Sequence, residues 1–241
     1  MSLLDEVLAA YGGIDRWRAV ETVRAHVRTG GLLLATRAPR ELVAEYRLTM
    51  RTGEQWVELD PVGVPERVVF DRGAVRLTGP DGEVLGERRD PRPLFFGRRG
   101  LRRNLRWDPL DLGYFAGYAM WNYLALPFLL AHDGVALTEL PGRRLDAVFP
   151  EAIHTHSSRQ TFWFGSDGLL RRHHYTAGVV GRWARAAHAV HDHREFDGLL
   201  FPTRRRVTPR GPGGRALPGP TLVWIAVDAV ERERGRFAAT A

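Results

Sequence analysis

The chain contains no cysteine and no lysine among its 241 residues. The lack of cysteine excludes disulfide bonds, thiolate catalysis, iron–sulfur clusters and cysteine-ligated zinc, so the fold relies on packing alone. The lack of lysine means that all 35 basic residues are arginines, against 28 acidic residues. This usage fits an arginine-biased coding background, which weakens the net charge of +7 as a sign of an anionic partner.

Arginine is concentrated in two clusters, at residues 98–106 and 204–206. Clusters of this kind hold phosphates in nucleic-acid-binding proteins. Acidic residues are nevertheless interspersed over most of the chain, and a solvated basic face explains the same pattern. We therefore expect no nucleic-acid partner.

The sequence also lacks the signatures of serine hydrolases and nucleotide-binding enzymes. Ser157 and Ser158 are not part of a Gly-x-Ser-x-Gly elbow. Residues 97–100, Gly-Arg-Arg-Gly, do not fit a P-loop or a dinucleotide-binding fingerprint. These absences favour a function without a cofactor.

No basic start followed by an apolar run and a cleavage site is present at the N-terminus, so the sequence predicts a cytoplasmic location. Residues 112–131 carry no charge and are about long enough to cross a bilayer. Gly113, Gly117, Asn122 and Pro127 within this segment favour a buried helix pair or a broken helix over a membrane span. We expect no stable membrane insertion.

Hydrophobic periodicity divides the chain into strands and helices. Apolar residues at helical spacing predict an N-terminal helix at residues 2–11, and a second, brief helix over residues 14–20. A helical insert follows at about residues 91–131. Alternating segments typical of strands lie before and after this insert. They are residues 23–27, 32–34, 41–50, 55–59, 67–70, 75–78, 84–87, 135–140, 144–149, 160–164, 169–176, 186–194, 200–207 and 221–230.

About a dozen strands and one apolar insert predict a mainly β (α+β) protein. No linker or repeat divides the chain, so we expect a single domain, residues 1–241. The layered solution is a large curved antiparallel sheet, or half-barrel, wrapped around the helical insert.

Two segments add a family resemblance to this order of elements. Residues 11–23, Tyr-Gly-Gly-Ile-Asp-Arg-Trp-Arg-Ala-Val-Glu-Thr-Val, and residues 196–203, Phe-Asp-Gly-Leu-Leu-Phe-Pro-Thr, are similar to segments of many predicted bacterial members of one group. That group is the half-barrel lipoprotein-carrier fold of outer-membrane lipoprotein chaperones and related lipid-binding proteins. The sequence has no cysteine for lipid attachment, and we expect it to differ from the carriers also in lacking their leader. The resemblance implies a strongly bent sheet plugged by helices.

Seven of the nine histidines lie between His154 and His193. Histidine titrates nearest to neutral pH, so such a cluster offers groups for proton transfer. In a regular strand, His173 and Tyr175 share a face, as do His188 and Asp192. We expect His173 on the concave face, because the opposite face carries the more soluble set Arg172, His174 and Thr176. The candidate catalytic residues are His156, His173, Tyr175, Asp192 and His193.

Two alternatives remain for this cluster. Asp192 and His193 face the same pocket only if the strand is irregular, and Asp192 is otherwise free to pair with an arginine. His154 and His156 share a face, so with nitrogen and oxygen ligands from neighbouring strands they also suit zinc, iron or manganese. The spacing matches no established metal signature.

The helical insert supplies aromatic surface for a pocket inside the sheet. Its candidate ligand-binding residues are Tyr114, Tyr118, Trp121, Asn122 and Tyr123. The simpler alternative is that each polar tip bonds to the backbone and that no ligand enters.

These features predict binding of a hydrophobic small molecule in the concave pocket. The histidines favour cofactor-independent acid–base chemistry on it, of the cyclase, isomerase or lyase type used in bacterial specialised biosynthesis. The first alternative is a non-catalytic carrier of a lipid or other hydrophobic ligand, and the second is a metal enzyme with histidine ligands. The sequence leaves the oligomeric state and the identity of the ligand open.

Overall fold

The structure is a computed structural model that describes residues 1–234, without the side chains of residues 99, 104 and 234. The last seven residues of the predicted single domain, 235–241, lie outside the described residues.

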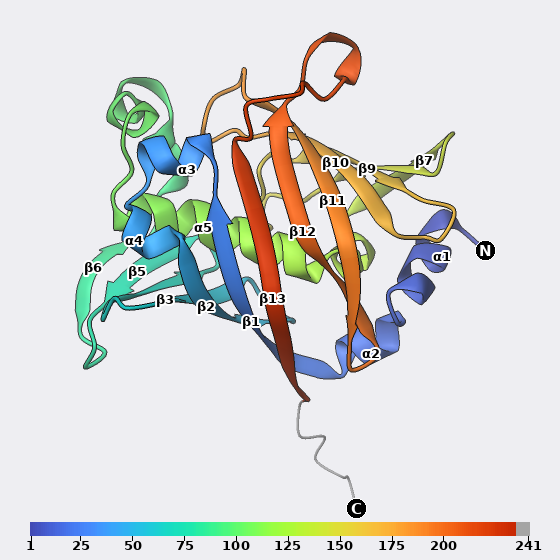
Figure 1. Cartoon of the computed structure of the whole chain (residues 1–241), viewed down its shortest axis with the longest axis horizontal. Coiled ribbons are helices and arrows are strands. Elements are labelled where there is room, and N and C mark those ends of the chain that lie inside the picture. Colours follow the sequence, from blue (N-terminus) through green and yellow to red (C-terminus); the bar gives the residue numbers. More distant parts are fainter. Residues whose placement is uncertain (235–241) are drawn as a thin grey trace, which may run out of the picture.

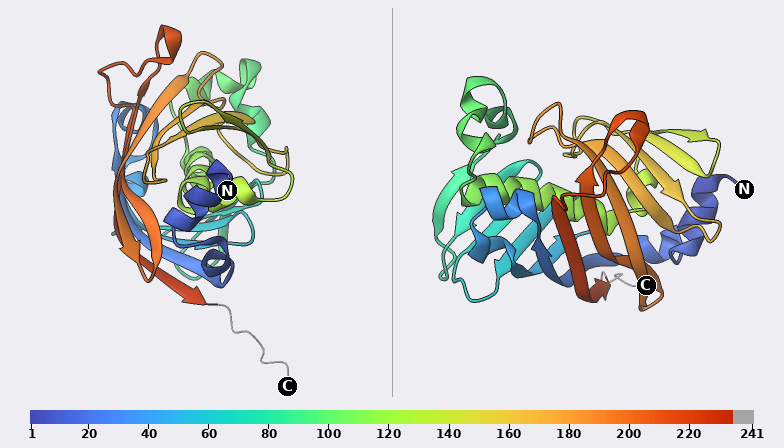
Figure 2. Two further views of the ribbon diagram at one scale, coloured as in Figure 1. Left: turned by 90° about the vertical axis from the view of Figure 1, so that its right-hand side faces the viewer. Right: turned by 45° about the horizontal axis from the view of Figure 1, so that its top comes forward.

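One antiparallel sheet of 13 strands forms the framework, in the order β6-β5-β4-β3-β2-β1-β13-β12-β11-β10-β9-β8-β7. The first and last strands pair at its centre, and a meander runs outward from each of them. Figures 1 and 2 show the sheet bent around a central helix. The strands are β1 Val20–Gly30, β2 Glu45–Arg51, β3 Trp56–Pro61, β4 Arg67–Asp71, β5 Ala74–Thr78, β6 Val84–Arg88, β7 Ala136–Leu140, β8 Arg144–Val148, β9 Arg159–Phe164, β10 Leu170–Thr176, β11 Arg185–Phe196, β12 Leu199–Pro209 and β13 Val223–Arg234. The prediction of a curved antiparallel half-barrel with about a dozen strands is confirmed.

The central helix is α5, Pro109–Ala125, and it lies on the concave side of the sheet (Figure 1). Asp108 begins it with a capping box in which its side chain accepts from the Asp111 N–H at 2.9 Å. Every residue from Asp111 to Ala125 is buried. A helix that is buried all round needs partners on every side, and a sheet that curves around it provides them. Within the described residues, no helix is long and apolar enough to cross a membrane.

Shorter helices cover the ends of the half-barrel. The N-terminal helix predicted at residues 2–11 is α1, Leu3–Ala10, with Ser2 as its N-cap. It is followed by α2, Ile14–Arg18. The insert predicted at about residues 91–131 consists of α5 flanked by 3-10 turns. These turns are η1 Arg92–Phe95, η2 Gly97–Gly100, η3 Arg102–Asn104 and η4 Phe128–Ala131, and a further one, η5, is Pro212–Gly214.

The strand predicted at residues 32–34 is wrong. Leu32–Arg37 forms helix α3 and Arg40–Val43 forms helix α4, so β2 begins only at Glu45. Gly31 has a φ of 113°, which turns the chain away from β1. Residues 32–34 are all leucine, so they show no alternation of apolar and polar side chains. Leu32 is 49% exposed, whereas Leu34 is buried.

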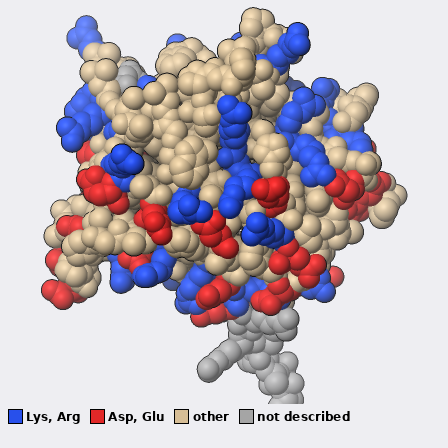
Figure 3. Space-filling view, viewed as in Figure 1, with Lys and Arg blue, Asp and Glu red and all other residues tan. Residues whose placement is uncertain are grey.

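The convex face of the central strands is polar and carries both charges (Figure 3). Asp228 on β13 pairs there with Arg28 at 2.6 Å and with Arg204 at 3.3 Å. Many of these arginines are therefore compensated by neighbouring carboxylates.

Candidate functional site

A cluster of buried polar side chains lies on the concave face, between the last turns of α5 and strands β9 to β12. The register of the sheet creates it, because His173 on β10 is directly opposite His188 on β11. Both histidines are 1% exposed. The irregular segment before β9 adds His156, whose ring stacks on Tyr175 at 4.1 Å between centroids.

His156 is fully hydrogen-bonded within this cluster. Its Nδ1 pairs with the Tyr118 hydroxyl at 3.1 Å, and its Nε2 pairs with the Tyr123 hydroxyl at 2.6 Å. The Tyr123 hydroxyl lies 3.0 Å from that of Tyr175. A connected chain therefore runs from Tyr118 through His156 and Tyr123 to Tyr175.

His173 and His188 lack this complete pairing. The Gln160 side chain donates from Nε2 to the Ser157 carbonyl and accepts with Oε1 from His173 Nε2. His173 Nδ1 is then an acceptor without a partner among the described residues, and neither nitrogen of His188 has one. Buried polar atoms are nearly always hydrogen-bonded in folded proteins, so these nitrogens mark an unusual place in the core.

The cluster is electrically neutral apart from one arginine. Burial and, to a smaller extent, the charge of Arg92 together lower the pKa of His156 to about 3. Burial also lowers the pKa of His173 and of His188 well below the usual value, with smaller contributions from neighbouring histidines and from Arg205. These three histidines are neutral at physiological pH.

That arginine is Arg205 on β12, which is 4% exposed. Its guanidinium lies 4.9 Å from the centre of the Tyr123 ring, and its Nη2 donates to the Tyr123 carbonyl at 2.7 Å. Its Nη1 has no partner among the described residues.

A small apolar cavity of about 40 Å³ adjoins the cluster. Tyr123 and Tyr175 belong to both the cluster and the cavity wall. The cavity lies between α5 and strands β1, β2, β12 and β13. Its lining residues are Thr29, Leu34, Val43, Tyr46, Phe115, Ala116, Ala119, Met120, Tyr123, Tyr175, Val207, Val223 and Ile225.

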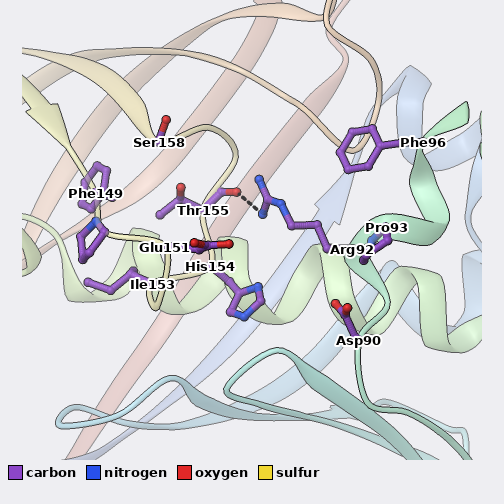
Figure 4. A pocket seen from close by; sticks show the side chains of 11 residues that line it. Asp90, Arg92, Pro93, Phe96, Phe149, Glu151, Ile153, His154, Thr155 and Ser158 are labelled. Atoms are coloured by element: carbon purple, nitrogen blue, oxygen red, sulfur yellow. Dashed lines mark hydrogen bonds between the residues drawn. The ribbon is translucent and has the colours of Figure 1, made fainter.

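An open cleft of about 670 Å³ lies between the segment 90–96 and the segment 149–158 (Figure 4). Arg92 crosses it and donates to the Thr155 carbonyl at 2.9 Å and to the Tyr114 hydroxyl at 3.2 Å. The same hydroxyl pairs with His154 Nδ1 at 3.0 Å. His154 and Thr155 therefore face the cleft, while the next residue, His156, belongs to the buried cluster.

Of the predicted catalytic residues, the structure brings together His156, His173 and Tyr175. Asp192 is exposed and lies outside the cluster, where its φ of 52° breaks the alternation of β11. The next residue, His193, faces inward instead and pairs with the Tyr11 hydroxyl at 2.8 Å, away from the cluster. Asp192 and His193, two of the candidate catalytic residues, therefore do not join the cluster.

The predicted ligand-binding residues separate around α5. Tyr118 and Tyr123 reach the cluster, and Tyr114 reaches the cleft. Trp121 donates to the Arg51 carbonyl at 2.8 Å, and Asn122 donates to the His154 carbonyl at 2.9 Å. These last two side chains serve the packing of α5.

His154 and His156 lie against consecutive turns of α5. Nδ1 of His154 and both ring nitrogens of His156 already pair with tyrosine hydroxyls of that helix. In the part of the chain that the structure describes, no three His, Asp or Glu side chains are grouped to hold a metal ion.

His174 is also buried, 4.4 Å from Trp163 between ring centroids, so the face opposite His173 is less soluble than predicted.

Sequence reasoning missed His188, Gln160 and Arg205 as members of the site. Arg205 is the middle residue of an arginine triplet that suggests a solvated face. Strand alternation was the available signal, because it turns the middle side chain of such a triplet to the opposite face from its neighbours.

No protein-family model matches the sequence, and no curated protein matches it. A LolA superfamily protein from Nitrosomonas europaea is structurally similar, with 10% identity, a TM-score of 0.46, and coverage of 93% of this chain and 91% of that chain. A DUF1329 family protein from Desulfovibrio piger has 13% identity, a TM-score of 0.48, and coverage of 96% and 92%. The lipoprotein LppX from Mycobacterium tuberculosis has 11% identity, a TM-score of 0.28, and coverage of 93% and 92%. The strongly bent antiparallel sheet with a helix inside it, which the resemblance implies, is present in the structure.

Proposed function

We propose that this protein is a carrier that binds a hydrophobic small molecule between α5 and the concave face of the sheet. The observation that supports the proposal is the apolar cavity at this interface. Apolar and aromatic side chains make up nearly all of its wall, as is usual in sites for small hydrophobic ligands.

At about 40 Å³ the cavity accommodates only a few atoms, so binding requires its wall to move. Leu34 of α3 and Val43 of α4 form one side of that wall. These helices have only six and four residues and connect β1 to β2 without belonging to the sheet. Their displacement opens the cavity without breaking any strand pairing.

The pKa values favour a carrier over an acid–base enzyme. A general base works best with a pKa near the operating pH. Burial instead lowers the pKa of His156 to about 3 and raises the pKa of Tyr123 to about 12. Among the described residues, no carboxylate contributes to the pKa of His173 or His188.

A cofactor-independent enzyme is the second candidate, favoured by one observation. The hydrogen-bonded chain from Tyr118 through His156 to Tyr123 and Tyr175 is a path along which a proton can move. A ligand that brings water or a negative charge into the cluster raises the pKa of His156 toward neutrality.

The test of the carrier proposal is titration with the neutral fluorescent probe N-phenyl-1-naphthylamine. We expect saturable binding by the wild type. Ala119→Val fills the cavity and should weaken binding about tenfold, which corresponds to 1.4 kcal/mol. Ala136→Val, on the exposed part of edge strand β7, is the matched control and should bind like the wild type.

Two results contradict the proposal. One is a wild type that does not bind the neutral probe. The other is unchanged binding in Ala119→Val, which would place the probe elsewhere on the protein. Melting temperatures of both variants establish that they are folded.

A further inference from the structure

Three consecutive arginines on β12 have different environments. Arg204 and Arg206 point to the convex side, where Arg204 pairs with Asp228 at 3.3 Å and Arg206 donates to Thr221 at 2.8 Å. Arg205 points to the concave side and is 4% exposed. The sequence therefore places one cation inside the half-barrel.

No carboxylate compensates this cation among the described residues. The groups that raise the pKa of Arg205 electrostatically are the tyrosines Tyr123, Tyr11 and Tyr175, whereas burial, the largest effect, lowers it. An arginine stays protonated even when buried. A buried charge without a counter-charge costs several kcal/mol of stability.

Unused hydrogen-bonding groups lie against the same tyrosine ring. Arg205 Nη1 is unpartnered in the described part of the chain, and so are both nitrogens of His188. The ring of Tyr123 lies against both residues, 4.9 Å from the guanidinium and 4.9 Å from the His188 ring. A neutral His188 can present one N–H to an acceptor placed there.

The apolar cavity begins beside this group. Tyr123 and Tyr175 line it, and so does Val207, which is two residues after Arg205 on the same face of β12. A molecule with an acceptor near Arg205 therefore has its apolar part directed between α5 and the sheet.

We propose that Arg205 and His188 form an internal binding site for the carboxylate of an amphipathic ligand, such as a long-chain fatty acid, whose tail occupies the space along α5. This inference rests on the proposed function and specifies its ligand class. A carboxylate matches the planar guanidinium and carries the single negative charge that compensates one arginine. Beside neutral histidines, a phosphate dianion would leave an excess negative charge.

The test compares the fluorescent fatty acid cis-parinaric acid with its methyl ester, which has the same tail and no charge. We expect the wild type to bind the acid about tenfold more tightly than the ester or better, as for a charge-assisted hydrogen bond. Arg205→Met should bind the acid and the ester equally, with ester affinity unchanged. Arg204→Met is the matched control on the convex face and should keep the wild-type preference.

Folding of the variant is checked by its melting temperature. Without ligand, Arg205→Met removes an uncompensated buried charge, so we expect it to melt at or above the wild-type temperature. A large drop in melting temperature would instead assign Arg205 to the packing of α5.

The outcomes separate the two proposals. Equal wild-type affinity for acid and ester overturns the carboxylate site and leaves the carrier proposal standing. Binding of neither parinaric probe overturns the carboxylate site, and binding of neither these probes nor N-phenyl-1-naphthylamine overturns both proposals. A preference for the acid that survives in Arg205→Met also overturns the site, because another group must then recognise the carboxylate.

Discussion

Two residues in the concave cluster are equally buried but differ in their hydrogen bonds. His156 pairs through both ring nitrogens, whereas neither nitrogen of His188 has a partner among the described residues. An unmade hydrogen bond in the core costs more than a made one contributes. The two histidines therefore have opposite effects on stability.

Replacement of each histidine by phenylalanine tests this difference. His156→Phe leaves the Tyr118 hydroxyl unpaired, and we expect a loss of about 1–3 kcal/mol in the free energy of unfolding. His188→Phe keeps the ring volume and removes two unpaired polar atoms, so it should be neutral or stabilising. Urea denaturation measures both. A loss in His188→Phe as large as that in His156→Phe would show that His188 is hydrogen-bonded after all.

At the same scale, the sequence predicts the inward residues of regular strands and fails where the backbone departs from regularity. Alternation places His173 and Tyr175 correctly on the concave face. Asp192 adopts a left-handed conformation, so His193 takes the inward position that alternation gives to Asp192. The inward direction of Arg205 was not predicted, because a run of arginines usually indicates solvent exposure.

Among the elements, α5 packs unusually close to the sheet. A Cβ atom on Gly113 would collide with Val68, and one on Gly117 would collide with the Cβ of Phe70, both on β4. The two glycines lie four residues apart and so face the same strand. Their lack of side chains lets the helix approach β4.

Gly117→Ala tests whether this approach or helix propensity decides stability. Propensity alone predicts that alanine stabilises the helix by about 1 kcal/mol. We expect a net loss of about 1–3 kcal/mol instead, because the new methyl group overpacks a rigid contact. Gly53→Ala, where a Cβ meets open space, is the control and should be nearly neutral. Increased stability in Gly117→Ala would contradict the close packing of α5 on β4.

Local patterns predict most elements but not how they are connected. The alternating segments, the N-terminal helix and the insert are visible in the sequence because each has a regular period. The pairing of β1 with β13 is a contact between the two ends of the chain, for which no local pattern exists. Helix α3 was missed because a leucine triplet fits a buried strand as well as a helix.

For the whole molecule, the buried histidines predict sensitivity to acid. His156, His173 and His188 have pKa values depressed by burial, whereas in the unfolded chain a histidine titrates near 6.5. Above pH 6.5 neither state binds these protons. As the pH falls below 6.5, the unfolded state becomes protonated and the folded state does not, so stability decreases.

The size of this effect is large compared with typical stabilities. Each of the three histidines contributes about 1.4 kcal/mol per pH unit below 6.5, so together they remove about 6 kcal/mol by pH 5. His174 and His193, whose pKa values are lowered to about 4, add to this loss. Typical domains have about 5–15 kcal/mol in total. We therefore expect the melting temperature to fall steeply between pH 7 and pH 5, with unfolding at ambient temperature between about pH 4 and pH 5.5.

Carboxylates contribute little in this range, because they titrate near pH 4 in the unfolded chain. For Asp108, burial raises the pKa, but hydrogen bonds from Arg88, Arg102 and the Asp111 N–H outweigh burial and hold it well below its usual range. Its contribution to stability is lost only as the pH falls below about 4.

The slope of stability against pH between pH 6.5 and pH 5 therefore reports the histidines. In His188→Phe this slope should decrease by at most about one fifth, because His174 and His193, with pKa values lowered to about 4, also take up protons on unfolding together with His156 and His173. A melting temperature that stays constant from pH 7 to pH 5 would mean that the folded protein protonates these histidines as readily as the unfolded chain, which a sealed, neutral cluster does not allow.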